Sequence, residues 1–97
     1  MKKQSRIPTK KRRVTFKLID SWAREISLVG DFNQWDPERH PMKKGKQGRW
    51  TKTVCLTPGI YQYKFLVDGK WITDKRNPVS CTNSFGGRNS LISIDSK

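Results

Sequence analysis

The stretch 60–74, IYQYKFLVDGKWITD, carries an amine and an indole whose spacing could form a binding site for a polar ligand. Its central Asp68-Gly69 lies between two β-rich runs and is typical of a type I′ hairpin turn. Such a turn pairs Leu66 with Trp71, and side chains then alternate between the two faces of the sheet. Lys64 and Trp71 therefore lie diagonally on one face, within about 7–8 Å of each other at Cα.

A flat ring with a hydrogen-bond donor beside it suits two kinds of ligand. Single-stranded nucleic acid stacks its bases on rings and needs Lys or Arg to neutralise phosphate. A pyranose packs its C–H groups against an indole, and its hydroxyls bind side chains such as Lys and Asn. Trp71 also has a purely structural interpretation, in which it covers Leu66 across the strands or packs in a second core under a long loop.

A second stretch, GDFNQWDP at 30–37, places two large rings among residues that favour turns. Phe32 has the parity of Ile26 and Leu28 in the preceding run, so we expect it to anchor the loop in the core. Trp35 follows three residues beyond that anchor. The residues alone leave open whether the Trp35 ring is buried or offered to a ligand.

The elements that must position these rings are short strands. Apolar and polar residues alternate along VTFKLID (14–20), REISLVG (24–30), GRWTKTVCL (48–56), the hairpin and SLISID (90–95), with a short edge strand near Met42. Stretch 76–89 is rich in turn formers, and we expect a long loop there. Six or seven short strands after residue 13 predict an antiparallel β-sandwich.

The hairpin register also predicts which side chains fill the core. One face is apolar and is assigned to the core: Tyr61, Tyr63, Phe65, Val67 and Ile72. The other face mixes apolar and polar groups: Ile60, Gln62, Lys64, Leu66, Trp71 and Thr73.

The chain has 97 residues and a net charge of +13, which fits one domain. The first 13 residues, MKKQSRIPTKKRR, hold seven basic residues and no acid. We predict a disordered basic arm over residues 1–13 and a folded domain over 14–97. The arm either solvates the chain or contacts nucleic acid, an acidic protein or a membrane surface.

Composition also bears on location. No apolar run is long enough for a membrane span, and the arm lacks the apolar stretch of a secretory signal. Cys55 and Cys81 do not have the spacing of a zinc site. We therefore expect two reduced thiols in a cytoplasmic protein, with a single disulfide as the alternative.

The sequence predicts neither catalytic residues nor a bound metal or cofactor. Glycoside hydrolysis usually needs two carboxylates on either side of the bond, whereas the acids here mostly follow strands or lie in turns, as Asp68 and Asp31 do. His40 has no obvious partner and is expected to be solvated. Cys55 lies on the strand face opposite to Trp50, Val54 and Leu56. Because it is next to Leu56, we expect it to be a small packing residue.

Four pieces in order, LVGDFNQWDP, GRW, PGIYQYKFLVDGKWITD and FGGRNSLISI, resemble carbohydrate-binding module family 48. That family includes the glycogen-binding domain of the AMP-activated protein kinase β subunit and the N-terminal early-set domains of isoamylase and glycogen branching enzyme. The resemblance covers residues 14–94. Each piece alone is common, but their joint order is specific.

The resemblance implies an immunoglobulin-like sandwich that binds α-1,4-linked glucan without cleaving it. By position, it implies that Trp35 and Trp71 stack on sugar rings and that Lys64 and Asn89 hydrogen-bond sugar hydroxyls.

The sequence departs from the kinase-type pattern in the loop before Asn89. A leucine and a threonine of that pattern correspond here to Phe85 and Gly87. Phe85 is expected either to contact sugar as a larger apolar group or to plug the core. The missing threonine hydroxyl is expected to change affinity and any preference for branched or cyclic glucans.

Three hypotheses for function follow. The first is non-catalytic binding of glycogen, starch or maltooligosaccharide. The second is a structural or adaptor domain that docks on a glucan-processing glycoside hydrolase or branching enzyme without binding sugar. The third is a basic nucleic-acid-binding module that uses the arm and exposed rings.

Overall fold

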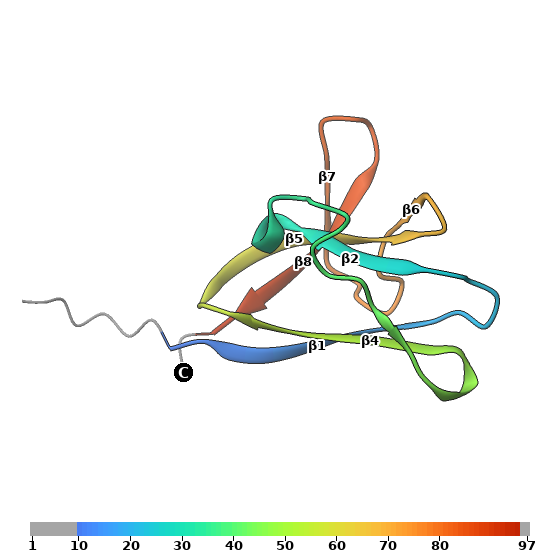
Figure 1. The fold of residues 1–97 in the computed structure, drawn as a ribbon. Coiled ribbons are helices and arrows are strands. Elements are labelled where there is room, and N and C mark those ends of the chain that lie inside the picture. The colour runs from blue at the N-terminus through green and yellow to red at the C-terminus, as the bar shows by residue number, and fades with distance from the viewer. Residues whose placement is uncertain (1–9, 96–97) are drawn as a thin grey trace, which may run out of the picture.

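The computed structural model describes residues 10–95, and within this range the chain forms eight strands in two antiparallel sheets that face each other (Figure 1). The strands are β1 (Arg12–Ile19), β2 (Ile26–Gly30), β3 (Lys43–Lys44), β4 (Arg49–Leu56), β5 (Gly59–Val67), β6 (Lys70–Ile72), β7 (Ser80–Thr82) and β8 (Arg88–Ile94). Two short 3-10 turns, η1 (Asp31–Asn33) and η2 (Lys46–Gly48), complete the described elements. The predicted β-sandwich is confirmed.

The two sheets differ in size. The smaller has three strands in the order β1-β4-β3, and the larger has five, in the order β2-β5-β8-β7 with β6 paired to β5. In Figure 1, β1 and β4 form the lower layer, whereas β2, β5 and β6 lie in the upper layer. No helix within residues 10–95 has the length and apolar character needed to cross a bilayer.

The β5–β6 hairpin has the predicted register. Leu66 pairs with Trp71, and the two turn residues have φ angles of 48° at Asp68 and 86° at Gly69, as a type I′ turn requires. The Asp68 carboxylate also accepts hydrogen bonds from the backbone N–H groups of Arg24 and Glu25. The predicted core face is confirmed, because Tyr63, Phe65 and Val67 are buried and Tyr61 and Ile72 pack against them.

The core between the sheets is rich in aromatic rings. Phe16 of β1 meets Tyr63 edge to face, with 4.9 Å between ring centroids, which is a favoured arrangement for an aromatic pair. Phe32 lies 5.6 Å from Phe16 by the same measure and is partly buried against the core. The predicted anchoring role of Phe32 is therefore confirmed.

The buried Tyr63 side chain anchors the connection from β6 to β7. The Tyr63 hydroxyl donates to the Asp74 carboxylate at 2.7 Å and accepts from Asn77 at 3.1 Å. Burial raises the pKa of this phenol well above its usual value, and Asp74 raises it further while Asn77 opposes the shift. Tyr63 therefore stays protonated and holds the turn in place.

Stretch 76–89 is not the continuous loop that we expected. It contains β7, whose Cys81 pairs with Asn89 of β8. Because β7 has only three residues between turn formers, its strand character comes from its partner and not from its own pattern. β8 accordingly begins at Arg88, two residues before the predicted strand.

Two further expectations are corrected in the small sheet. β1 begins at Arg12, inside the predicted arm, because Arg12 and Arg13 pair with the end of β4. Residues 1–9 of that arm lie outside the described residues. Cys55 is exposed on β4, so the prediction that it is a small packing residue is wrong. Its neighbours Val54 and Leu56 point inward, and alternation turns Cys55 outward.

Candidate functional site

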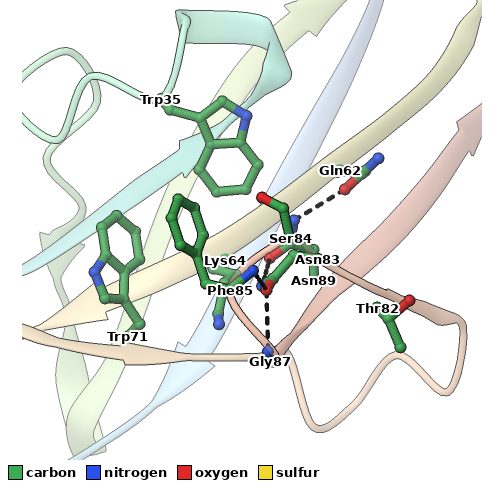
Figure 2. Close-up of a pocket in the computed structure, with 10 residues that line it drawn as sticks. All are labelled: Trp35, Gln62, Lys64, Trp71, Thr82, Asn83, Ser84, Phe85, Gly87 and Asn89. Carbon is green, nitrogen blue, oxygen red and sulfur yellow. Dashed lines mark hydrogen bonds between the residues drawn. The ribbon is translucent and has the colours of Figure 1, made fainter.

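A pocket of about 860 Å³ lies over the outward face of the five-stranded sheet. Figure 2 shows side chains from the η1 loop, β5, β6 and the β7–β8 hairpin around it. The pocket brings together all five residues that the sequence analysis assigned to sugar contact: Trp35, Lys64, Trp71, Phe85 and Asn89. Its other lining residues are Gln62, Thr82, Asn83, Ser84 and Gly87.

Two indoles form one side of this pocket. The ring centroids of Trp35 and Trp71 are 6.4 Å apart and the ring planes are inclined by 60°. Trp71 is 49% exposed, so it is not covered by the β7–β8 hairpin in a second core. The two rings are therefore neighbours that present inclined surfaces to solvent.

Asp31 fixes the position of Trp35. Its carboxylate accepts the indole N–H of Trp35 at 2.9 Å on one oxygen and the backbone N–H of Gln62 at 2.8 Å on the other. This bridge shows that Asp31 fixes the loop. It ties the loop that carries Trp35 to β5, the strand that also carries Lys64 and pairs with β6.

The backbone around Trp35 is held in an uncommon conformation. Gln34 and Trp35 have φ angles of 56° and 58°, in the left-handed region that costs roughly 1–2 kcal/mol for a residue other than glycine. The backbone N–H of Trp35 donates to the Gly30 carbonyl at 2.9 Å. Gly30 itself has no room for a side chain, because an added Cβ would lie 2.5 Å from the Gln62 carbonyl oxygen. The loop therefore sits tightly on β5.

A buried amide supports the same loop from below. Asn33 is fully buried, and its side-chain oxygen accepts the backbone N–H of Gly30 at 3.0 Å. Its amide nitrogen donates to the Leu28 carbonyl at 3.0 Å and approaches His40 Nδ1 at 2.8 Å. Because an amide nitrogen can only donate, His40 Nδ1 must accept, and the ring is neutral with its proton on Nε2.

His40 is thus only partly solvated, and Asn33 is a partner that the sequence did not indicate. Burial lowers the pKa of His40 below its usual value, and the positive charges of Lys52 and Arg39 lower it further. This contact could not be predicted from the sequence, because the partner amide lies seven residues away in an irregular loop.

The floor of the pocket is a chain of amides. Asn83 accepts the backbone N–H groups of Phe85 at 2.9 Å and Gly87 at 3.0 Å, which shapes the turn. Its amide nitrogen donates to Asn89 at 3.0 Å, and Asn89 donates to Gln62 at 2.9 Å. Asn89 is 7% exposed and retains one N–H and one lone pair for a ligand.

Lys64 is the polar group with most capacity left. Among residues 10–95 its ammonium makes no protein hydrogen bond or ion pair within bonding distance, and it lies close to Gly87. Sequence analysis did not assign Gln62 or Asn83 to the site. Gln62 could have been assigned to the site, because it lies two residues from Lys64 and so shares its face of the sheet. Asn83 could not, because only the folded β7–β8 hairpin brings it to the pocket.

Phe85 lies at the edge of the pocket and is 95% exposed. The suggestion that it plugs the core is therefore wrong. Its ring lines the same pocket as the two indoles (Figure 2).

None of the residues that line the pocket is Asp, Glu or His, so the pocket lacks the two carboxylates that glycoside hydrolysis usually uses. Within the described part of the chain no three His, Cys, Asp or Glu side chains gather as metal ligands.

Comparison with known proteins identifies the fold and the family. A profile of the family described as the glycogen recognition site of AMP-activated protein kinase matches residues 14–97. The chain belongs to this family. As a member of this carbohydrate-binding module family it is a non-catalytic domain, and the resemblance stated from the sequence is confirmed.

Two curated relatives illustrate the range of the family. The chloroplastic protein PTST homolog 2 of Arabidopsis thaliana is 39% identical over 72 residues, which cover 74% of this chain and 13% of that protein. The human 5′-AMP-activated protein kinase subunit beta-2 is 33% identical over 87 residues, which cover 90% of this chain and 31% of that subunit. The chain thus spans less than a third of the length of either relative.

A solved structure of a maltogenic amylase from S. marinus has the same fold over 90% of this chain and 14% of the amylase, with a TM-score of 0.75 and 23% identity. This likeness concerns the sandwich alone.

Proposed function

We propose that this domain binds α-1,4-linked glucan, as glycogen, starch or maltooligosaccharide, in the pocket beside Trp35 and Trp71. The observation that carries the proposal is the pair of inclined, solvent-facing indoles above an amide floor. Membership in a glycogen-recognition family supports it.

The chemistry of the pocket matches a neutral sugar chain. Each indole offers an apolar face to pyranose C–H groups, and two inclined faces can contact successive sugars of a curved chain. Lys64 supplies up to three donors and Asn89 supplies one donor and one acceptor to the hydroxyls. The exposed ring of Phe85 adds apolar area that a bound chain would cover.

Affinity electrophoresis in a gel that contains glycogen tests the proposal. We expect glycogen to retard the wild-type chain. We expect Trp71→Ala to migrate in the glycogen gel at nearly its sugar-free rate. Burial of roughly 100 Å² of indole contributes about 2.5 kcal/mol, which the alanine variant forfeits. Trp22→Ala is the matched control, because Trp22 is exposed but does not line the pocket. Migration of the wild type at its sugar-free rate would contradict the proposal.

The adaptor hypothesis is the second candidate, and one observation favours it. The same sandwich forms 14% of a maltogenic amylase chain, so the fold occurs beside a much larger partner. If the domain only docks, glycogen will not retard it, and a co-purified glucan-processing enzyme will bind Trp71→Ala as well as wild type.

The nucleic-acid hypothesis is less well supported at this pocket. Lys64 is the single cation among the lining residues, whereas stacking sites for single strands track the phosphates with a positive groove. Retention of the chain on single-stranded DNA through Trp71 would reverse this conclusion.

A further inference from the structure

The positive charge of the strands is segregated on the sheet that does not carry the pocket. Strands β1, β3 and β4 contain seven basic residues and no acid: Arg12, Arg13, Lys17, Lys43, Lys44, Arg49 and Lys52. The strands of the larger sheet contain three basic residues, Lys64, Lys70 and Arg88. A pocket for neutral sugar does not explain charge on the opposite side of the molecule.

Strand alternation turns four of these cations toward solvent on one flat surface, which we call the basic face: Arg13, Lys17, Lys43 and Arg49. The Thr15 and Thr53 hydroxyls are bonded across this surface at 2.8 Å. Along β1, Arg13 and Lys17 are about 13 Å apart, and across the strands Lys17 and Lys43 are about 10 Å apart. No acid lies among the outward positions of these strands.

Apolar side chains border the same sheet at one end. Ile19 pairs with Arg49 and is 52% exposed, and Trp22, three residues further on, is 92% exposed. The Asp20 carboxylate accepts the backbone N–H groups of Trp22 and Ala23, each at 2.9 Å. Ala23 is buried, so this turn is anchored while the indole of Trp22 projects into solvent.

We propose that the basic face docks on an anionic lipid surface, with Ile19 and Trp22 entering the bilayer interface. Lys and Arg near such a surface are attracted to its negative potential, and Trp prefers the headgroup region. A bilayer suits this face better than nucleic acid does. The one exposed ring, Trp22, lies at the end of the face and not among its cations, so the face lacks the interleaved rings and cations of a single-strand site. Its four cations lie on a flat sheet and not on a helix or ribbon that could enter a groove.

The two sheets then have different partners. The pocket lies on the outward face of the larger sheet and the basic face is the outward face of the smaller one. Because the two sheets face each other (Figure 1), a docked domain would still offer the pocket to a glucan. This inference is independent of the proposed function, because it uses no residue of the pocket.

Vesicle flotation of the full chain tests the inference. At low salt we expect the wild type to float with phosphatidylcholine vesicles that contain phosphatidylglycerol, and not with pure phosphatidylcholine. Lys17→Gln/Arg49→Gln should reduce partitioning about 30-fold, because each surface cation contributes roughly fivefold. Trp22→Ala should reduce it several-fold.

The matched control is Lys70→Gln/Lys75→Gln, which removes the same charge from exposed positions outside the basic face. We expect this control to bind vesicles within about threefold of wild type, since charges beyond a Debye length are screened. Circular dichroism reports whether each variant is folded, without any use of glucan binding.

Equal losses in the two charge variants would overturn the inference, as would flotation with pure phosphatidylcholine. Binding to duplex DNA or polyglutamate at the same salt, without flotation on anionic vesicles, would also overturn it and assign the face to those partners.

Discussion

Two polar residues beside the site, Asp31 and Asn33, hold the loop that carries Trp35. Asp31 does not itself line the pocket, yet it holds the Trp35 indole and the β5 backbone with its two oxygens. Asn33 similarly holds the loop through three contacts. If the pocket binds glucan as proposed, we expect its affinity to depend on these positioning side chains.

Replacing one oxygen of Asp31 tests this positioning role. In Asp31→Asn the side chain can still accept from one group but not from both, so we expect Trp35 to lose its fixed orientation. Glycogen affinity should fall roughly tenfold, the effect of one charge-assisted hydrogen bond. Isothermal titration with maltoheptaose measures the loss.

Asp36→Asn is the control, because Asp36 accepts the backbone N–H of Glu38 in the same loop and does not line the pocket. Equal affinities of Asp31→Asn and wild type would show that Trp35 needs no such support.

The missing threonine hydroxyl can be restored at Gly87. A Cβ there would lie 3.4 Å from the Asn83 amide nitrogen and 3.8 Å from Lys64 Nζ, both ordinary contacts. Gly87→Thr should therefore fit and tighten maltoheptaose binding about three- to tenfold, the contribution of one hydrogen bond. Gly87→Val has nearly the same shape without the hydroxyl, and an equal gain in both variants would refute the role of the hydroxyl.

At the scale of elements, the η1 loop is the part of the site most sensitive to pH. His40 is the sole histidine of the chain, and its neutral form accepts from Asn33. Its folded pKa is lowered below 6.5, so the unfolded state binds the proton more readily. The stabilisation is complete above pH 6.5 and is lost as pH falls through the folded pKa.

Chemical denaturation at pH 7.5 and pH 5.5 checks this dependence. We expect the free energy of unfolding of the wild type to fall between the two values. His40→Ala removes the acceptor at every pH, so it should be about 1–2 kcal/mol less stable at pH 7.5 and nearly independent of pH in this range. A wild type with the same stability at both values would contradict the assignment.

The elements also show which structure a single sequence can predict. The β5–β6 register followed from Asp68-Gly69, because a two-residue turn fixes pairing locally. β7 was missed, because its three residues become a strand only through pairing with Asn89 and its neighbours. The position of Trp35 was likewise undecided, because two consecutive left-handed residues place it and no pattern of alternation describes such a loop.

At the scale of the molecule, the two sheets carry different chemistries. The larger sheet presents indoles and amides, and the smaller presents cations. Net charge alone had suggested nucleic acid as a partner for the exposed rings. In the folded domain the indoles of the pocket lie on the larger sheet, whereas most of the strand cations lie on the smaller one. The alternation of residues along β1 and β4 could have indicated this separation.

Salt should distinguish the two surfaces. Between about 50 mM and 500 mM NaCl the Debye length shortens from roughly 14 Å to about 4 Å. Flotation on anionic vesicles should fall more than about tenfold over this range, whereas maltoheptaose affinity should change less than about twofold because the sugar is neutral. Parallel loss of both activities would show that one charged surface serves both ligands.

The opposed placement of the pocket and the basic face has a consequence for assemblies of many copies. A glucan particle that is coated with this domain would display an array of basic faces outward. Attachment of such a particle to a charged bilayer would be multivalent, so its avidity could exceed the affinity of one copy by about 10²–10⁴. Adhesion would then depend steeply on how densely the domain covers the particle, and a modest loss of coverage would release it.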